Sequence, residues 1–174
     1  EIASQLRPGS YAAEFDLVLA HIGAFVALRD TAASAATRKA PILINGYDYF
    51  QPRAAGAPWF RGGRLGSGPW VFPVLRDAGL TAAQMREAAA AVIDCFHERL
   101  IAAFGGCSDI HVVDSRSVLS PAHPASTGEY GDWLDEIHPS KAGFEKLADC
   151  RWSRAVASRG RSGAHGAVPR AAAQ

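Results

Sequence analysis

The stretch APILING at residues 40–46 decides the fold class of this 174-residue chain. Its run of β-branched and aliphatic side chains is entered through Pro41 and left through Gly46, a pattern typical of a fully buried strand in a parallel sheet. A second run, DIHVVD at residues 109–114, has the same character and predicts a neighbouring strand.

The segment between the two runs predicts a helix. Thr81 and Gln84 form a capping box, and an apolar stripe from Met85 to Phe104 follows at helical spacing. Two glycines after Phe104 are expected to end this helix. A strand, a helix and a second strand in this order imply parallel pairing, and the chain is therefore expected to be an α/β protein.

Upstream of the first strand, apolar residues from Tyr11 to Arg29 recur at helical spacing and predict a helix over residues 11–35. Residues 16–22 can also be interpreted as a buried strand, and both interpretations stay open at this point. Residues 50–80 are rich in Gly, Pro and aromatic side chains and predict a long ordered loop, here called the excursion. Its aromatic side chains, at residues 59–72, are expected either to pack against the domain and hold the loop in place or to cover a pocket for an acyl or alkyl group.

The C-terminal part predicts one more helix, capped by Ser140 and ending near Cys150. Residues 155–174 have no apolar periodicity and predict a disordered tail, which leaves residues 1–154 as the folded domain. The arginines of this tail are typical of a solvated terminus rather than of an RNA-binding segment.

Composition excludes several function classes. The formal net charge is +1, so no overall field favours nucleic acid or an anionic membrane. No uninterrupted apolar stretch of about 18 residues occurs, and no membrane span is expected. Cys95, Cys107 and Cys150 fit no metal-binding spacing and are expected to be free and buried, with one disulfide as the alternative. The chain begins with Glu1, so we expect a leader or a longer N-terminal part to precede it; no pattern assigns a compartment or an oligomeric state.

The sharpest chemical motif is WLDEIHP at residues 133–139, in a loop after the second predicted strand. A carboxylate at Asp135 can accept a hydrogen bond from the imidazole Nδ1 of His138, fix its tautomer and stabilise its protonated form. Asp132, three residues earlier, is an alternative partner. In the plainer interpretation Asp135 only caps the following helix, and His138 is an ordinary loop histidine.

Three segments together resemble the C-terminal part of the SGNH/GDSL-type serine esterase family. They are ILINGYDY at 42–49, IHVVD at 110–114, and WLDEIHP at 133–139 followed by Gly143 and Phe144. The resemblance implies a flavodoxin-like three-layer α/β/α SGNH-hydrolase fold, partial here because the N-terminal strands are missing. It also implies hydrolysis of carboxylic esters, with a small-molecule ester as substrate and without a cofactor or a metal.

Carried over to this chain, the resemblance implies that His138 is the general base of a Ser-His-Asp triad and that Asp135 is its orienting partner. The family's Gly-Asp-Ser nucleophile motif, however, occurs nowhere in the sequence. Ser4, Ser10 and Ser67 are only formally available, since none stands in a strand-to-helix elbow. The chain alone is therefore expected to be inactive, and a non-catalytic truncated or pseudoenzyme α/β domain is the alternative.

Metal chemistry is the least favoured hypothesis. A metal-dependent hydrolase would use His111, Asp114 and His138, but the histidines at 21, 97 and 111 lie on separate predicted elements without the spacing of ligands.

Overall fold

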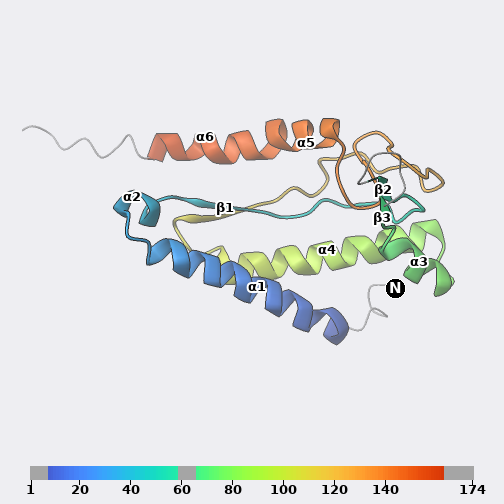
Figure 1. Cartoon of the computed structure of the whole chain (residues 1–174), viewed down its shortest axis with the longest axis horizontal. Helices are drawn as coiled ribbons and strands as arrows, with labels where there is room; N and C mark the ends of the chain where they lie inside the picture. Colours follow the sequence, from blue (N-terminus) through green and yellow to red (C-terminus); the bar gives the residue numbers. More distant parts are fainter. Residues whose placement is uncertain (1–7, 59–65, 163–174) are drawn as a thin grey trace, which may run out of the picture.

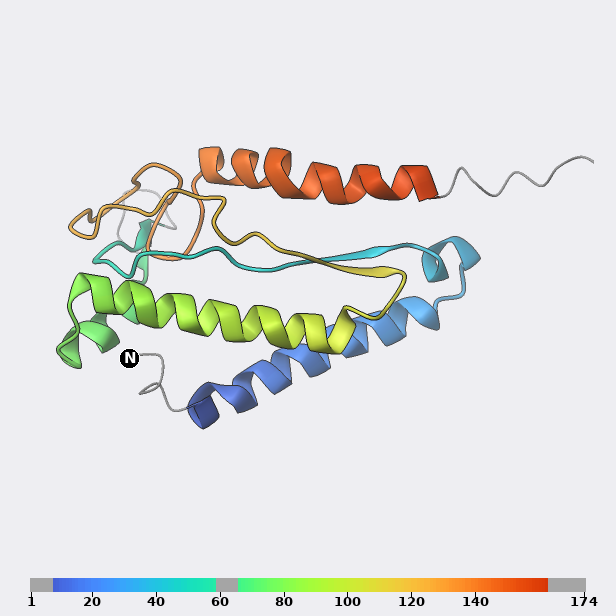
Figure 2. The ribbon, with the colours of Figure 1, turned by 180° about the vertical axis from the view of Figure 1, so that it is seen from behind.

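The computed structural model describes residues 8–58 and 66–162, which form an α/β structure, as predicted (Figure 1). Two parallel strands lie between α1 and α4 on one side and α5 and α6 on the other (Figure 2). The elements in chain order are α1 (Pro8–Asp30), α2 (Ala35–Arg38), β1 (Ile42–Asn45), β2 (Ala57–Pro58), β3 (Gly66–Ser67), α3 (Val71–Asp77), α4 (Ala82–Phe104), β4 (Ile110–Val113), α5 (Lys141–Leu147), η1 (Ala148–Trp152) and α6 (Ser153–Ser162).

The central sheet consists of β1 and β4, paired in parallel with Ile42 opposite Ile110 and Asn45 opposite Val113. The two strands and their pairing confirm the prediction from residues 40–46 and 109–114. The prediction that β1 is fully buried is wrong, because its side chains alternate between partly buried and exposed, and Leu43 is 40% exposed. Within the described residues β4 is the only strand beside β1, so one edge of β1 has no neighbour to cover it.

Helix α4 lies between the two strands in sequence and contributes more buried hydrophobic residues than any other described element. Thr81 accepts a hydrogen bond from the amide of Gln84 and the Gln84 side chain accepts one from the amide of Thr81, which completes the predicted capping box. The buried face of α4 contributes to two clusters, one around Trp133 near the start of the helix and one around Leu100 below the strands. The helix ends at Phe104, with Gly105 as its C-cap.

Helix α1 confirms the helical interpretation of the N-terminal segment and excludes a strand at residues 16–22. Its last turn is anchored by Arg29, which is 8% exposed, donates to the carbonyl of Ala40 and forms an ion pair with Asp109. By length and composition the stretch Tyr11–Asp30, of mean hydropathy 1.5, would be able to cross a membrane. A core helix or a signal sequence passes the same test, so this helix alone is weak evidence for a span.

The C-terminal helix extends further than predicted. Ser140 caps α5 by accepting from the amide of Gly143, as expected, but the helix does not end near Cys150. It continues through the π-helical turn η1 into α6, so the prediction of a disordered tail is wrong for residues 155–162; residues 163–174 lie outside the described part. This stretch contains alanines and arginines, which are strong helix formers.

Two further predictions need correction. The excursion over residues 50–80 contains α3 and the β2–β3 pair, and the sequence predicted neither. The Gly and Pro residues around these short elements are typical of loops and leave no helical or strand periodicity to recognise. The cysteines are free, as expected, but the prediction that they are buried is wrong, since Cys95 and Cys150 are partly exposed and Cys107 is exposed.

An ion-pair cluster ties the end of β4 to α4. Arg116 contacts Asp114 through two of its nitrogens and Asp94 of α4 through a third, at 2.7–2.9 Å. The hydrogen bonds from Arg116 outweigh partial burial and lower the pKa of Asp114 from 3.8 to about 2. A carboxylate whose pKa is lowered on folding stabilises the native state above its unfolded pKa and loses that contribution as pH falls through the folded pKa.

We therefore expect the stabilisation by Arg116 to be pH-dependent. Arg116→Gln is predicted to lower the free energy of unfolding most above pH 4, and the difference from wild type should shrink between pH 3.8 and about 2. Urea unfolding followed by circular dichroism at several pH values measures this difference. A difference that stays constant down to pH 2 would contradict the assignment.

The orientation of α4 is tested by two adjacent leucine-sized side chains. Leu100 is fully buried and Ile101 is 46% exposed. We expect Leu100→Ala to cost about 2–5 kcal/mol of unfolding free energy, because it leaves a cavity in the core. Ile101→Ala should change stability by about 0.5 kcal/mol or less. Equal losses in thermal or urea unfolding would contradict this packing.

Candidate active site

The motif at residues 133–139 lies in a tightly closed loop between β4 and α5. The amide of Leu134 donates to the carbonyl of His138 at 2.9 Å, and the amide of Ser140 donates to the carbonyl of Asp132 at 2.8 Å. Trp133, 1% exposed, fixes the loop in the core, and its indole nitrogen donates to the carbonyl of Ser120. The backbone between Leu134 and His138 therefore forms a narrow turn that brings a carboxylate and an imidazole together.

Asp135 and His138 are joined by a side-chain hydrogen bond. Oδ2 of Asp135 lies 2.8 Å from Nδ1 of His138, and Oδ1 accepts from the amides of Ile137 and His138 at 2.8 and 2.6 Å. Asp135 is fully buried, whereas the imidazole side chain is 38% exposed. This is the geometry that the motif predicted; the catalytic role of the pair stays a prediction.

The two alternatives for Asp135 do not fit this geometry. The helix that follows is capped by Ser140, so capping is not the function of Asp135. Asp132 is engaged by other groups: its Oδ2 accepts from the amide of Ser120 at 2.7 Å and from Nζ of Lys146 at 2.8 Å. Burial opposes ionisation of Asp132, but the bonds from Lys146 and Ser120 outweigh it and lower its pKa.

Gly143 lets α5 approach this loop closely. A Cβ atom at this position would lie 2.2 Å from the carbonyl oxygen of Asp132, well inside van der Waals contact. Position 143 must therefore be a glycine for α5 to pack where it does.

A buried arginine supports the loop from below. Arg53 is fully buried and donates to the carbonyl of Asp135 at 2.7 Å and to carbonyls of Ser126 and Gly128 in the neighbouring loop. Burial lowers the pKa of Arg53, while the charges of Asp135 and Glu136 act in the opposite direction. The guanidinium thus supplies the positive charge that two buried carboxylates need.

Two side chains from the exit of β1 complete the support. The hydroxyl of Tyr47 donates to the carbonyl of Ile137 at 2.6 Å, and burial, followed by the charge of Asp135, raises the pKa of Tyr47 to about 12. Asp48, 3% exposed, accepts from the amides of residues 117–119 at 2.6–3.0 Å and so holds the loop after β4. The sequence singled out this Gly-Tyr-Asp-Tyr exit only through the family resemblance.

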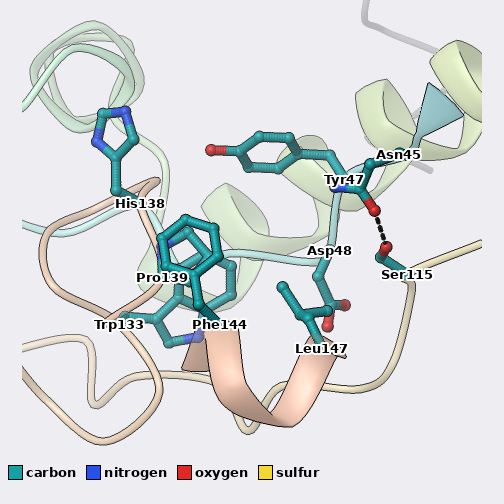
Figure 3. Close-up of a pocket in the computed structure, with 10 residues that line it drawn as sticks. Asn45, Tyr47, Asp48, Ser115, Trp133, His138, Pro139, Phe144 and Leu147 are labelled. Atoms are coloured by element: carbon teal, nitrogen blue, oxygen red, sulfur yellow. Dashed lines mark hydrogen bonds between the residues drawn. The ribbon is translucent and has the colours of Figure 1, made fainter. Parts of the chain in front are cut away.

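The dyad borders a cleft of about 260 Å³ at the C-terminal ends of β1 and β4 (Figure 3). Its lining is mostly apolar and consists of Asn45, Gly46, Tyr47, Asp48, Ser115, Trp133, His138, Pro139, Phe144 and Leu147. In Figure 3 the imidazole of His138 stands at one side, Asn45 and Ser115 stand at the other, and the ring of Tyr47 extends between them. Such a cleft has room for a small aliphatic or aromatic group beside one titratable side chain.

The three serines considered from the sequence all lie away from the dyad loop in sequence, and a fourth serine lines the cleft. Ser10 lies in the first turn of α1, Ser67 lies in β3, and Ser4 lies outside the described residues. Ser115 is the serine of the cleft; it is 1% exposed, and its hydroxyl donates to Oδ1 of Asn45 at 2.5 Å.

The structure does not gather the residues of the metal hypothesis. No group of three or more His, Cys, Asp or Glu side chains in the described ranges could hold a metal ion, and Asp114 is engaged by Arg116 instead. Of the aromatic excursion, Trp59 and Phe60 lie outside the described residues. Trp70 contacts the imidazole of His138 with ring centroids 5.7 Å apart and an interplanar angle of 77°.

Comparison with protein-family models, with curated proteins and with solved structures found no match to this chain. The fold and the dyad thus define an α/β protein with a carboxylate–imidazole pair at the C-terminal end of its sheet. The SGNH/GDSL resemblance enters below as a proposal.

The partner of His138 is tested by two isosteric substitutions. Asp135→Asn removes the acceptor that keeps the proton on Nδ1, and we expect the neutral imidazole to shift toward the Nε2-protonated tautomer. It should also cost about 1–3 kcal/mol of unfolding free energy, because two amides lose a charged acceptor. Imidazole ¹⁵N chemical shifts at alkaline pH report the tautomer.

Asp132→Asn is the matched control, since it alters a carboxylate in the same loop that binds Lys146 rather than His138. It should leave the tautomer unchanged. A tautomer shift in Asp132→Asn, or none in Asp135→Asn, would contradict the assignment.

Proposed function

We propose that this chain is part of a serine-esterase-type hydrolase of the SGNH/GDSL family that acts on carboxylic esters. The observation that carries the proposal is the 2.8 Å hydrogen bond between the buried Asp135 and the partly exposed His138, beside an apolar cleft. Loops at the C-terminal ends of parallel strands are where α/β proteins gather their reactive groups.

The finer fold is part of the same proposal. Parallel pairing of β1 and β4, the connecting helix α4, and helices on both sides of the sheet are compatible with a flavodoxin-like three-layer α/β/α SGNH-hydrolase domain of which the N-terminal strands are missing. The free edge of β1 is the place where further parallel strands would pair, and their crossover helices would cover the face on which Leu43 is exposed.

In the proposed reaction His138 works as general base and then as general acid. A serine Oγ attacks the ester carbonyl carbon while its proton passes to Nε2 of His138, the ring nitrogen that does not bind Asp135. The tetrahedral intermediate then expels the alcohol, which takes the same proton from Nε2, and an acyl-serine is left. Water releases the acid by the same sequence with the imidazole again accepting and returning one proton.

The supporting residues keep this imidazole ready for proton transfer. Asp135 holds Nδ1 protonated and stabilises the imidazolium that forms in each step. Tyr47 and Arg53 bind the carbonyls of Ile137 and Asp135, so the turn that carries the dyad is held from both sides. The apolar lining of the cleft favours an uncharged acyl or alkyl group as its occupant.

The proposal requires a serine that this chain does not carry in a Gly-Asp-Ser motif. Removing the nucleophile of such a triad costs several orders of magnitude in rate, so the 174-residue chain by itself is expected to be inactive or nearly so.

A non-catalytic truncated or pseudoenzyme α/β domain is the second candidate. The observations that favour it are the missing motif and Ser115, whose hydroxyl is engaged by Asn45 rather than by the dyad. The coding sequence upstream of Glu1 separates the two candidates: an in-frame Gly-Asp-Ser in a strand-to-helix context favours the esterase.

The decisive experiment extends the chain by its upstream coding sequence and measures hydrolysis of p-nitrophenyl esters. We expect His138→Ala to lower kcat by about three orders of magnitude or more, because the serine loses its base. His21→Ala, which removes an exposed histidine of α1, serves as the control and should leave kcat unchanged. Equal rates for His138→Ala and His21→Ala would refute the role of His138.

A further inference from the structure

Glu136 stands between the two members of the dyad in sequence, yet its carboxylate is directed elsewhere. It is 1% exposed, and its two oxygens accept from the amides of Trp70, Val71 and Phe72 at 2.6, 2.6 and 2.8 Å. These amides open α3, more than 60 residues upstream. A buried carboxylate with three amide donors forms a strong, long-range connection between the dyad loop and this helix.

Helix α3 depends on this connection for its start. Within the described residues it has no side-chain cap of its own, and no acidic residue lies in its first turn. The opening amides of a helix need acceptors, and a negative charge near them is favourable. Glu136 meets both requirements from the loop, so the place where α3 begins is determined by the residue next to Asp135.

The residue that α3 thereby positions is Trp70. Its indole makes the ring contact with His138 at 5.7 Å although the side chain is 42% exposed, so packing around it does not hold it alone. The indole also lies close to Gly68, at φ +81°, where a Cβ would come within 2.8 Å of the ring. The indole of Trp70 thus contacts both a glycine and the imidazole, and the backbone amide of Trp70 donates to Glu136.

We infer that Glu136 is a positioning residue that keeps the indole of Trp70 against the imidazole of His138, so that Trp70 forms a specificity-determining wall beside the reactive histidine. The catalytic meaning of the wall rests on the proposed function, but the contact itself does not. The indole restricts the orientations of the imidazole, excludes water from one side of it and presents an apolar surface to a group bound there.

Fluorescence of Trp70 tests this inference in the chain as it stands. An imidazolium in contact with an indole quenches its emission by accepting an electron from the excited ring, and neutral imidazole quenches far less. Subtracting the emission of Trp70→Phe from that of wild type isolates Trp70 from the other tryptophans. We expect this difference emission to be lower when His138 is protonated than when it is neutral, and this pH-dependent step to be absent in His138→Gln.

Glu136→Gln replaces one of the two acceptor oxygens by an NH2 donor, so the three amides of Trp70, Val71 and Phe72 lose part of their acceptor. We expect this variant to lack the pH-dependent step in Trp70 emission. The Trp70 emission of the variant is obtained by subtracting the emission of Glu136→Gln/Trp70→Phe from that of Glu136→Gln. Thr81→Ala, which removes the cap of α4 at an exposed position, is the control for stability loss and should retain the step. Glu136→Asp keeps the charge on a shorter arm, and we expect a step of reduced size.

If Glu136→Gln retained the full pH-dependent change in Trp70 emission, the positioning role would be overturned. It would also be overturned if Thr81→Ala lost as much of this change as Glu136→Gln does. If Glu136→Gln fails to fold, Glu136→Asp takes its place. A pH-dependent change in Trp70 emission of wild-type size in Glu136→Asp would then overturn the positioning role. A wild-type Trp70 emission that does not respond to His138 overturns the inference without any variant at 136. An ester assay in which His138→Ala has no effect would refute the proposed function and leave these fluorescence outcomes unaffected.

Discussion

Buried carboxylates in need of hydrogen-bond donors are the constraint on which this site depends. Asp48, Asp135 and Glu136 are each at most 3% exposed, and each is satisfied mainly by backbone amides of loops or of a helix start. An unsatisfied buried charge would cost several kcal/mol, about as much as a small domain can lose. The loops at this end of the sheet can therefore adopt only the path that delivers their amides to these three side chains.

The same constraint explains why the dyad, the cleft and α3 occupy one end of the molecule. Parallel strands end at a common edge, and the exits of β1 and β4 carry Asp48 and the loop that it organises. Arg53 then balances the charge of Asp135 and Glu136 from beneath while donating to the carbonyl of Asp135. The geometry of the Asp135–His138 pair and the stability of its loop thus depend on the same hydrogen bonds.

Local patterns predicted what depends on neighbours in sequence. The capping box at Thr81, the two strands and the Asp135–His138 bond all join residues no more than a few positions apart or follow from side-chain periodicity. Other contacts join residues more than 60 positions apart, and no local sequence pattern predicts them. They are the hydrogen bonds of Glu136 to the start of α3 and those of Arg53 to the dyad loop. The extension through η1 into α6 was missed for a different reason: helix propensity without an apolar face leaves no periodic signal.

The close approach at Gly143 has a consequence for the mobility of the imidazole. The first turn of α5 touches the carbonyl of Asp132, Ser140 caps that turn, and Lys146 from the next turn binds the carboxylate of Asp132. The dyad loop is therefore fastened to a helix at three points and cannot fluctuate without it. Although His138 stands in a coil segment, its backbone should exchange amide hydrogens as slowly as the helix beside it.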